Sequence, residues 1–81
     1  MAHVVATSEC RVFTGGVTEF DIEVSSVREM IDTLEARYPG LGEFVDRRMA
    51  IAIDGEIHQD AWFAPLSAAS EVYLIPKIGG G

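Results

Sequence analysis

Apolar and polar residues alternate along two segments of the chain, and each alternation predicts a strand with one solvent-facing side. In residues 20–24 every second residue is apolar, and acidic residues stand between them. Residues 49–53 alternate large with small side chains and end at Asp54-Gly55, a pair typical of tight turns. We expect a short return strand after this turn, over residues 56–58.

Two further segments are rich in residues that favour strands. Residues 3–13 contain several such residues and stop at Thr14-Gly15-Gly16, which indicates a hairpin turn into the next strand. Residues 71–75 are apolar on both faces, which is typical of a strand buried in the middle of a sheet. We therefore expect the last strand to lie centrally, beside the first.

Between these strands, apolar residues recur with the period of a helix over residues 27–37. The apolar positions are Val27, Met30, Ile31, Leu34 and Tyr38. Ser26 followed by Glu29 fits a capping box at the start of this helix. Pro39-Gly40 ends it, because proline restricts the preceding residue and glycine accepts left-handed dihedrals.

Two stretches show no clear period. Residues 42–48 are expected to be an irregular connection, and residues 59–70 a loop with one helical turn. That loop carries Trp62 and Phe63, whose rings we expect to fill the core, since aromatic side chains bury a large area. The order of elements predicts an α+β domain over residues 1–76, with one main helix covering a mixed sheet of four to five strands.

Length and charge limit the classes of function. A chain of 81 residues with 48% hydrophobic residues can form one core but not two. Thirteen acidic residues against six basic ones give a formal charge of −7, which repels nucleic acid and anionic membranes. Such a surface suits a partner with a basic face, and an acidic excess that only keeps the protein in solution explains the charge equally well. Cys10 is the single cysteine, and residues 1–6 do not resemble a secretion signal. We therefore expect a cytoplasmic protein.

The last strand is followed through Pro76 by a short run that ends in three glycines. At the end of a chain, glycines cannot serve a turn, a helix cap or a phosphate loop, because each of these needs residues on both sides. A tail without function is the simplest alternative. Glycine has no Cβ, however, so a Gly80-Gly81 end can enter a narrow cleft of a partner enzyme. We expect residues 77–81 to form a flexible tail that presents the Gly81 carboxylate.

Four segments together resemble the MoaD/ThiS sulfur carriers. They are the Thr14-Gly15-Gly16 turn, the helix and loop of residues 27–41, the strand of residues 49–56 and the end of the chain from residue 71 to residue 81. The resemblance implies a ubiquitin-like β-grasp fold. The chain has three terminal glycines where the family usually has two, and Pro76-Lys77 where MoaD-like members often have two prolines, which leaves the pathway open.

The resemblance also implies the chemistry and the partners. An E1-like adenylyltransferase would join Gly81 to AMP, using ATP and Mg²⁺ that the chain itself does not bind. A sulfur donor, either a persulfide or sulfide, would convert the adenylate to a thiocarboxylate. A downstream synthase would accept the sulfur in a biosynthetic pathway. The chain would thus be a carrier and not an enzyme. A ubiquitin-like modifier or a plain interaction module is the open alternative.

The surface that meets these partners follows from strand parity. If Val72 and Leu74 face the helix, Tyr73 and Ile75 face outward, and Ala50 and Ala52 share that outer face. The expected partner-binding residues are Tyr73, Ile75, Pro76, Lys77, Ile78, Gly79 and Gly80. A contact with a loop of this same chain, or a dimer contact, would explain an apolar outer face equally well.

Other groupings of polar residues indicate less. His3, His58, Asp54, Glu56 and Asp60 could be drawn as metal ligands, but their spacing matches no standard site, and we expect solvated side chains and no metal. No basic cluster surrounds Cys10, which is expected to be a packing residue. Ser25 and Ser26 with the histidines do not suggest a catalytic triad. Arg47-Arg48 could steer an activating enzyme or be ordinary surface charge.

Overall fold

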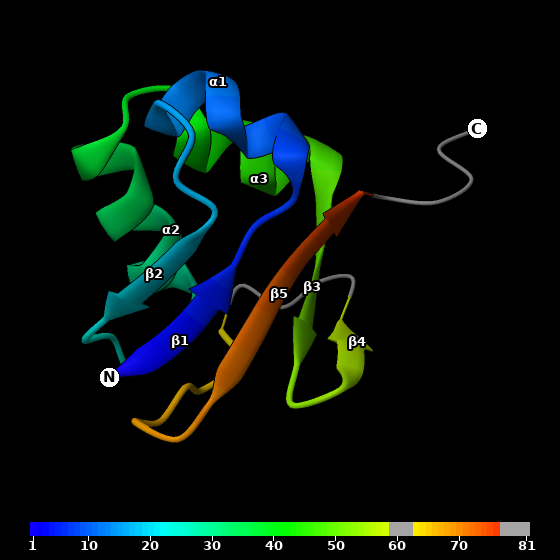
Figure 1. The fold of residues 1–81 in the computed structure, drawn as a ribbon. Coiled ribbons are helices and arrows are strands. Elements are labelled where there is room, and N and C mark those ends of the chain that lie inside the picture. Colours follow the sequence, from blue (N-terminus) through cyan, green and yellow to red (C-terminus); the bar gives the residue numbers. More distant parts are fainter. Residues whose placement is uncertain (59–62, 77–81) are drawn as a thin grey trace.

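The computed structural model describes residues 1–58 and 63–76 of the chain. Within them one sheet has the strand order β2-β1-β5-β3-β4 (Figure 1). Its strands are β1 (Ala2–Val5), β2 (Glu19–Ile22), β3 (Met49–Ile53), β4 (Glu56–His58) and β5 (Glu71–Pro76). β1 and β5 run parallel, and the other neighbouring pairs are antiparallel. The mixed sheet and the central position of the last strand beside the first are as predicted.

Helices α2 (Val27–Arg37) and α3 (Leu41–Arg48) cover one face of the sheet (Figure 1). A 3-10 helix, η1 (Ser8–Cys10), and the single turn α1 (Arg11–Thr14) lie between β1 and β2 in the chain. The α+β class is confirmed, and α2 has the predicted bounds. The opposite face of the sheet is not covered by any of these helices.

The start of α2 contains half of the predicted capping box. The Ser26 side chain accepts a hydrogen bond from the Glu29 backbone N–H over 3.2 Å. The Glu29 carboxylate does not return to Ser26; it accepts hydrogen bonds from the backbone N–H and hydroxyl of Ser25, at 3.1 and 2.9 Å. Both interactions satisfy polar groups at the helix start, so the polar residues here serve the fold.

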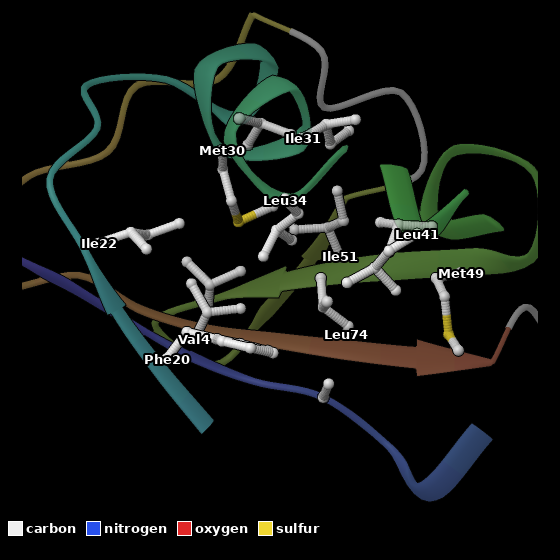
Figure 2. Close-up of a cluster of buried hydrophobic side chains, with 14 of the residues drawn as sticks. Val4, Phe20, Ile22, Met30, Ile31, Leu34, Leu41, Met49, Ile51 and Leu74 are labelled. Atoms are coloured by element: carbon white, nitrogen blue, oxygen red, sulfur yellow. The ribbon is translucent and has the colours of Figure 1, made fainter. Parts of the chain in front are cut away.

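The core lies between the sheet and the helices, and Figure 2 shows the side chains that fill it. The helices contribute Met30, Ile31, Leu34 and Leu41, and the strands contribute Val4, Phe20, Ile22, Met49, Ile51 and Leu74. All four of the predicted helix positions from Val27 to Leu34 are buried. The periodicity therefore identified the buried face of α2 correctly.

The prediction of a strand over residues 3–13 with a hairpin turn at Thr14-Gly15-Gly16 is wrong. β1 ends at Val5, and the chain then forms η1 and α1. Gly15 has a left-handed φ of 70° and ends α1, so the glycines form a helix C-cap. In this helical turn Phe13 packs against Phe44 of α3, with ring centroids 5.1 Å apart, a tertiary contact that goes with the helical conformation of strand-favouring residues.

The irregular connection expected over residues 42–48 is also wrong, because these residues belong to α3. Gly40 precedes the helix with a φ of 96°, and its backbone N–H donates to the Glu35 carboxylate over 2.8 Å. Leu41 and Val45 are fully buried, and Phe44 packs against the core beside them. Their spacing of three and four residues is a helical signal that the sequence does contain.

Phe63 was expected to fill the core, but its side chain is exposed and Leu66 is buried instead. Trp62 lies outside the described residues. The backbone of this segment pairs with the start of α2, where the Leu66 N–H donates to the Ser25 carbonyl over 2.9 Å. β5 was expected to be buried on both faces, and this is wrong too, since Tyr73 is 43% exposed.

Helix α3 packs tightly against α2 at Gly42. A Cβ at this position would stand 2.7 Å from the Glu35 Cβ and 2.9 Å from the Ile31 carbonyl oxygen. Gly42→Ala is therefore expected to destabilise the fold by about 1 to 3 kcal/mol, although alanine favours a helix interior more than glycine does. Urea unfolding measures this change.

The matched control is Gly55→Asn. Gly55 has a φ of 89° with nothing within 4 Å of an added Cβ, and asparagine tolerates this conformation better than most residues. We expect less than about 1 kcal/mol of destabilisation from it. Equal unfolding midpoints for Gly42→Ala and the unmodified chain would contradict the close packing of the two helices.

Candidate functional site

The face of the sheet opposite α2 and α3 carries apolar side chains along the central strand β5. Val72 and Leu74 are buried beneath the helices, Tyr73 is exposed on the opposite face and Ile75 is half-buried there. The parity predicted for these four residues is thus confirmed. The sequence therefore places alternate residues of β5 in the core and on a surface that can meet a partner.

Cross-strand register extends this surface over four strands. Tyr73 is the Cα partner of Val5 on β1 and of Ala52 on β3, and Ala52 is in turn opposite Ile57 on β4. Ala50 is opposite Ile75. We call the six residues the outer apolar face: Val5, Ala50, Ala52, Ile57, Tyr73 and Ile75. The two alanines are small and are buried between their larger neighbours, with 8% and 9% of their surface exposed.

Two members of the outer apolar face, Val5 and Ile57, were not identified from the sequence. Ile57 is 59% exposed, which is unusual for isoleucine. Val5 was missed because the strand predicted over residues 3–13 is longer than β1, so the outward-facing positions of that strand could not be assigned. For Ile57, alternation across the Asp54-Gly55 turn was the available signal.

The last described residue before the tail lies at the end of the strand that carries this face. Pro76, the last residue of β5, is exposed and is the Cα partner of Met49 at the start of β3. Three predicted partner-binding residues, Tyr73, Ile75 and Pro76, therefore lie on one strand that ends where the tail begins. The others, Lys77, Ile78, Gly79 and Gly80, lie outside the described residues, as does Gly81.

An acidic margin borders the outer apolar face on β1 and β2. The His3 ring lies between two carboxylates, with Nδ1 3.0 Å from Asp21 Oδ1 and Nε2 3.0 Å from Glu19 Oε1. The hydrogen bond to Asp21 and, to a lesser extent, the one to Glu19 raise the pKa of His3 above its ordinary value of 6.5. Both ring nitrogens can donate only when the imidazole is protonated, so this geometry favours the cation.

The raised pKa predicts how stability depends on pH. The stabilisation from the protonated His3 ring between the two carboxylates is fully present below a pH of about 6.5, the pKa of the unfolded state. It is lost as the pH rises through the higher pKa of the folded state. The unmodified chain should lose stability between about pH 6 and pH 8, and His3→Gln should not show this loss of stability. Asp21→Asn should show a smaller loss than the unmodified chain. Urea unfolding midpoints at the two pH values measure the change. An unchanged pH dependence in both variants would contradict the assignment.

Two of the shallow grooves formed by the described residues lie on the helical side of the molecule. One of about 220 Å³ is lined by Gly40, Glu43, Phe44, Arg47 and Arg48. The other, of about 360 Å³, is lined mainly by polar residues of α2 and α3: Asp32, Glu35, Glu43, Asp46 and Arg47, with Ile31 and Gly42. Neither groove is formed by the outer apolar face, so they are separate surfaces.

The described residues give no support to a nucleophilic cysteine or to a metal site. Burial raises the pKa of the Cys10 thiol, which makes the nucleophilic thiolate less available. His3 and His58 stand on strands separated by β5 and β3, or about 14 Å at normal strand spacing, so they cannot share a metal. No cluster of three potential ligands occurs in residues 1–58 and 63–76, and Asp60 lies outside them. Within the same residues, no helix is long and apolar enough to cross a bilayer.

Comparison with known proteins gives one family and several related structures. Residues 7–81 match the sequence model of the ThiS family. A search of curated proteins finds no match.

Among solved structures, the chain is similar to a chain of the BexX/CysO complex of Amycolatopsis orientalis, with 20% identity, full coverage of both chains and a TM-score of 0.85. It is also similar to CysO of Mycobacterium tuberculosis, with 19% identity over 96% of this chain and 100% of that one, at a TM-score of 0.84. It is similar, too, to small archaeal modifier protein 1 of Methanosarcina acetivorans, with 20% identity over 99% of this chain and 95% of that one, at a TM-score of 0.77. These likenesses confirm the ubiquitin-like β-grasp fold.

Proposed function

Because the chain belongs to the ThiS family, we propose that it is a sulfur carrier that works through the carboxylate of Gly81. The family match extends from residue 7 through Gly81 and so includes the three glycines, and this observation carries the proposal. On this proposal the chain is a protein substrate of other enzymes and does not itself catalyse a reaction.

The position of β5 supports this role. The strand is paired with β1 on one side and β3 on the other, and its core residues Val72 and Leu74 are fully buried. The tail therefore begins at a fixed point of the domain. Five residues reach at most about 18 Å when extended. A partner whose active site holds Gly81 must consequently approach the end of β5, where Tyr73, Ile75 and Pro76 can contact it.

The first chemical step activates the carboxylate. A Gly81 carboxylate oxygen attacks the α-phosphorus of ATP, pyrophosphate leaves, and an acyl adenylate forms. An E1-like adenylyltransferase would bind the ATP together with Mg²⁺, and the Mg²⁺ would neutralise the negative charge that develops on the phosphates. Residues 77–80 would act by threading through the enzyme's cleft, which the glycines allow because they have no side chains.

The second step introduces sulfur. Sulfide attacks the Gly81 carbonyl carbon and expels AMP, leaving a thiocarboxylate. If the donor is an enzyme persulfide, the first product is an acyl disulfide, and a thiol must then reduce it to release the thiocarboxylate. A downstream synthase would transfer this sulfur to a biosynthetic product, such as a cofactor, an amino acid or another metabolite.

Hydroxylamine trapping tests the proposed activation. Hydroxylamine attacks an acyl adenylate, releases AMP and leaves a hydroxamate on the activated carbonyl. The chain is incubated with ATP, Mg²⁺ and the adenylating enzyme that co-purifies with it from its own cells. We expect one hydroxamate, located at Gly81 by tandem mass spectrometry. A hydroxamate on a side-chain carboxylate, or none at any position, would count against the proposal.

The likeness to a small archaeal modifier protein supports a second candidate, a ubiquitin-like modifier. In that case the activated Gly81 carbonyl would be attacked by a lysine amine of another protein, forming an isopeptide bond. The two functions share the adenylate and diverge after it. Lysine-linked adducts of the chain in its own cells, without any thiocarboxylate, would favour the modifier.

A further inference from the structure

The basic pair Arg47 and Arg48 ends α3 at the edge of the domain from which the tail departs. Arg48 is followed directly by Met49, the Cα partner of Pro76 at the end of β5. Figure 1 shows α3 leading into β3 near the arrowhead of β5. In the sequence, Lys77 is the first residue after β5. The basic pair therefore lies next to the end of β5, the strand from which the tail begins.

The chain has 13 acidic residues and only six basic ones, and two of the six are adjacent at this position. The Nε of Arg47 is 3.3 Å from Glu43 Oε1, in a pair whose side chains are both largely exposed. The Arg48 guanidinium is also exposed, and it makes no hydrogen bond or ion pair with another of residues 1–58 and 63–76. Among these residues nothing competes with a group from another molecule for the Arg48 side chain.

The two arginines line the groove of about 220 Å³ together with Phe44, Gly40 and Glu43. A guanidinium binds a carboxylate through two parallel hydrogen bonds, and an aromatic ring beside it offers apolar contact to the rest of a peptide. The groove thus combines the groups that recognise an acidic side chain.

We propose that this groove binds an acidic segment of the protein that activates the tail, an inference that rests on the proposed function. The acidic segment would contact the basic pair while other parts of the activating protein bind the outer apolar face and the tail. Elsewhere the surface is predominantly acidic, as at the His3, Glu19 and Asp21 margin, and repels the same segment. The contact would therefore fix the orientation in which the tail is presented and increase the rate of productive encounters.

An alternative role for the basic pair lies within the chain. Cationic side chains in the last turn of a helix interact favourably with its dipole, and both arginines are in the last turn of α3. This role requires no partner. It predicts that loss of the arginines lowers the unfolding midpoint and changes no binding, so the two explanations can be separated by experiment.

The test is an NMR titration of the full chain, labelled with ¹⁵N, with a hexaglutamate peptide. We expect saturable shifts of the Gly40, Phe44, Arg47 and Arg48 amides that weaken as salt is added. The double variant Arg47→Gln/Arg48→Gln should bind on the order of tenfold more weakly. The matched control Arg28→Gln/Arg37→Gln removes the same charge from α2 and should bind as the unmodified chain does.

Equal binding by the Arg47→Gln/Arg48→Gln variant, or equally large shifts around Arg28 and Arg37, would overturn the inference. The adenylation assay adds a second readout, in which we expect the KM for the double variant to rise on the order of tenfold with kcat unchanged. The titration does not depend on adenylation. A chain that binds hexaglutamate in the groove but is never adenylated would refute the proposed function and retain the acidic-peptide site.

Discussion

Removal of Gly80 and Gly81 is expected to abolish ATP-dependent adenylation of the chain. The truncated chain would end at Gly79, two residues short of the position that the adenylating enzyme must reach, a loss of about 7 Å of extended backbone. The domain of residues 1–76 contains the whole described core, so its fold should not change. Formation of the AMP adduct, followed by intact mass, measures the loss.

A chain carrying a C-terminal amide at Gly81 is the matched control. It keeps the length of the tail and all three glycines but lacks the carboxylate that attacks ATP. We expect it to bind the adenylating enzyme as the unmodified chain does and to form no adduct. Adenylation of either the truncated or the amidated chain would show that another carboxyl group is activated.

Leu74→Ala is expected to cause the largest loss of stability. Leu74 is 1% exposed and lies on β5 in the centre of the core (Figure 2). Removing a buried leucine side chain costs about 2 to 5 kcal/mol, because apolar contacts are lost and a cavity remains. A domain of this size has about 4 to 12 kcal/mol of total stability. The variant should therefore lose a large fraction of it, as measured by urea unfolding.

The neighbouring Tyr73→Ala is the control for this change. Tyr73 follows Val72 on the same strand but faces outward and is 43% exposed, so its removal leaves no cavity in the core. We expect less than about 1.5 kcal/mol of destabilisation, together with weaker binding to the adenylating enzyme. Similar unfolding midpoints for the two variants would contradict the assignment of Leu74 to the core and Tyr73 to the outer apolar face.

The elements predicted correctly from the sequence are those in which local signals agree with one another. The helix over residues 27–37 has a consistent apolar period and a serine cap, and both act within a few residues. The β3–β4 turn needs positive φ, and Asp54 and Gly55 adopt values of 50° and 89°. In both cases the preferred local conformation is also the one that the tertiary structure requires.

The errors arise where a distant contact determines the local structure. Residues 11–14 favour a strand by composition, but the packing of Phe13 against Phe44, about 30 residues away in sequence, goes with a helical turn. Phe63 was assigned to the core on size alone, and the smaller Leu66 is buried there. Residues 42–48 differ, because the spacing of Leu41, Phe44 and Val45 is a readable signal that was passed over.

The candidate site was predictable only in part for the same reason. Parity along one strand identifies Tyr73 and Ile75 as outward-facing, since it depends only on the alternation of side chains. Ile57 could have been placed by alternation across the Asp54-Gly55 turn. The membership of Val5 depends on where β1 ends and how it aligns with β5, which the sequence of neither strand contains. The His3 contacts with Glu19 and Asp21 depend on the pairing of β1 with β2 in the same way.

The identity of the group at Gly81 distinguishes a sulfur carrier from a modifier and from an interaction module. Intact-mass measurement of the chain purified from its own cells, with tandem mass spectrometry of the C-terminal peptide, tests it most directly. A sulfur carrier should show a fraction of chains in which one oxygen at Gly81 is exchanged for sulfur. A free carboxylate at Gly81 in every chain, together with lysine-linked adducts, would contradict this account.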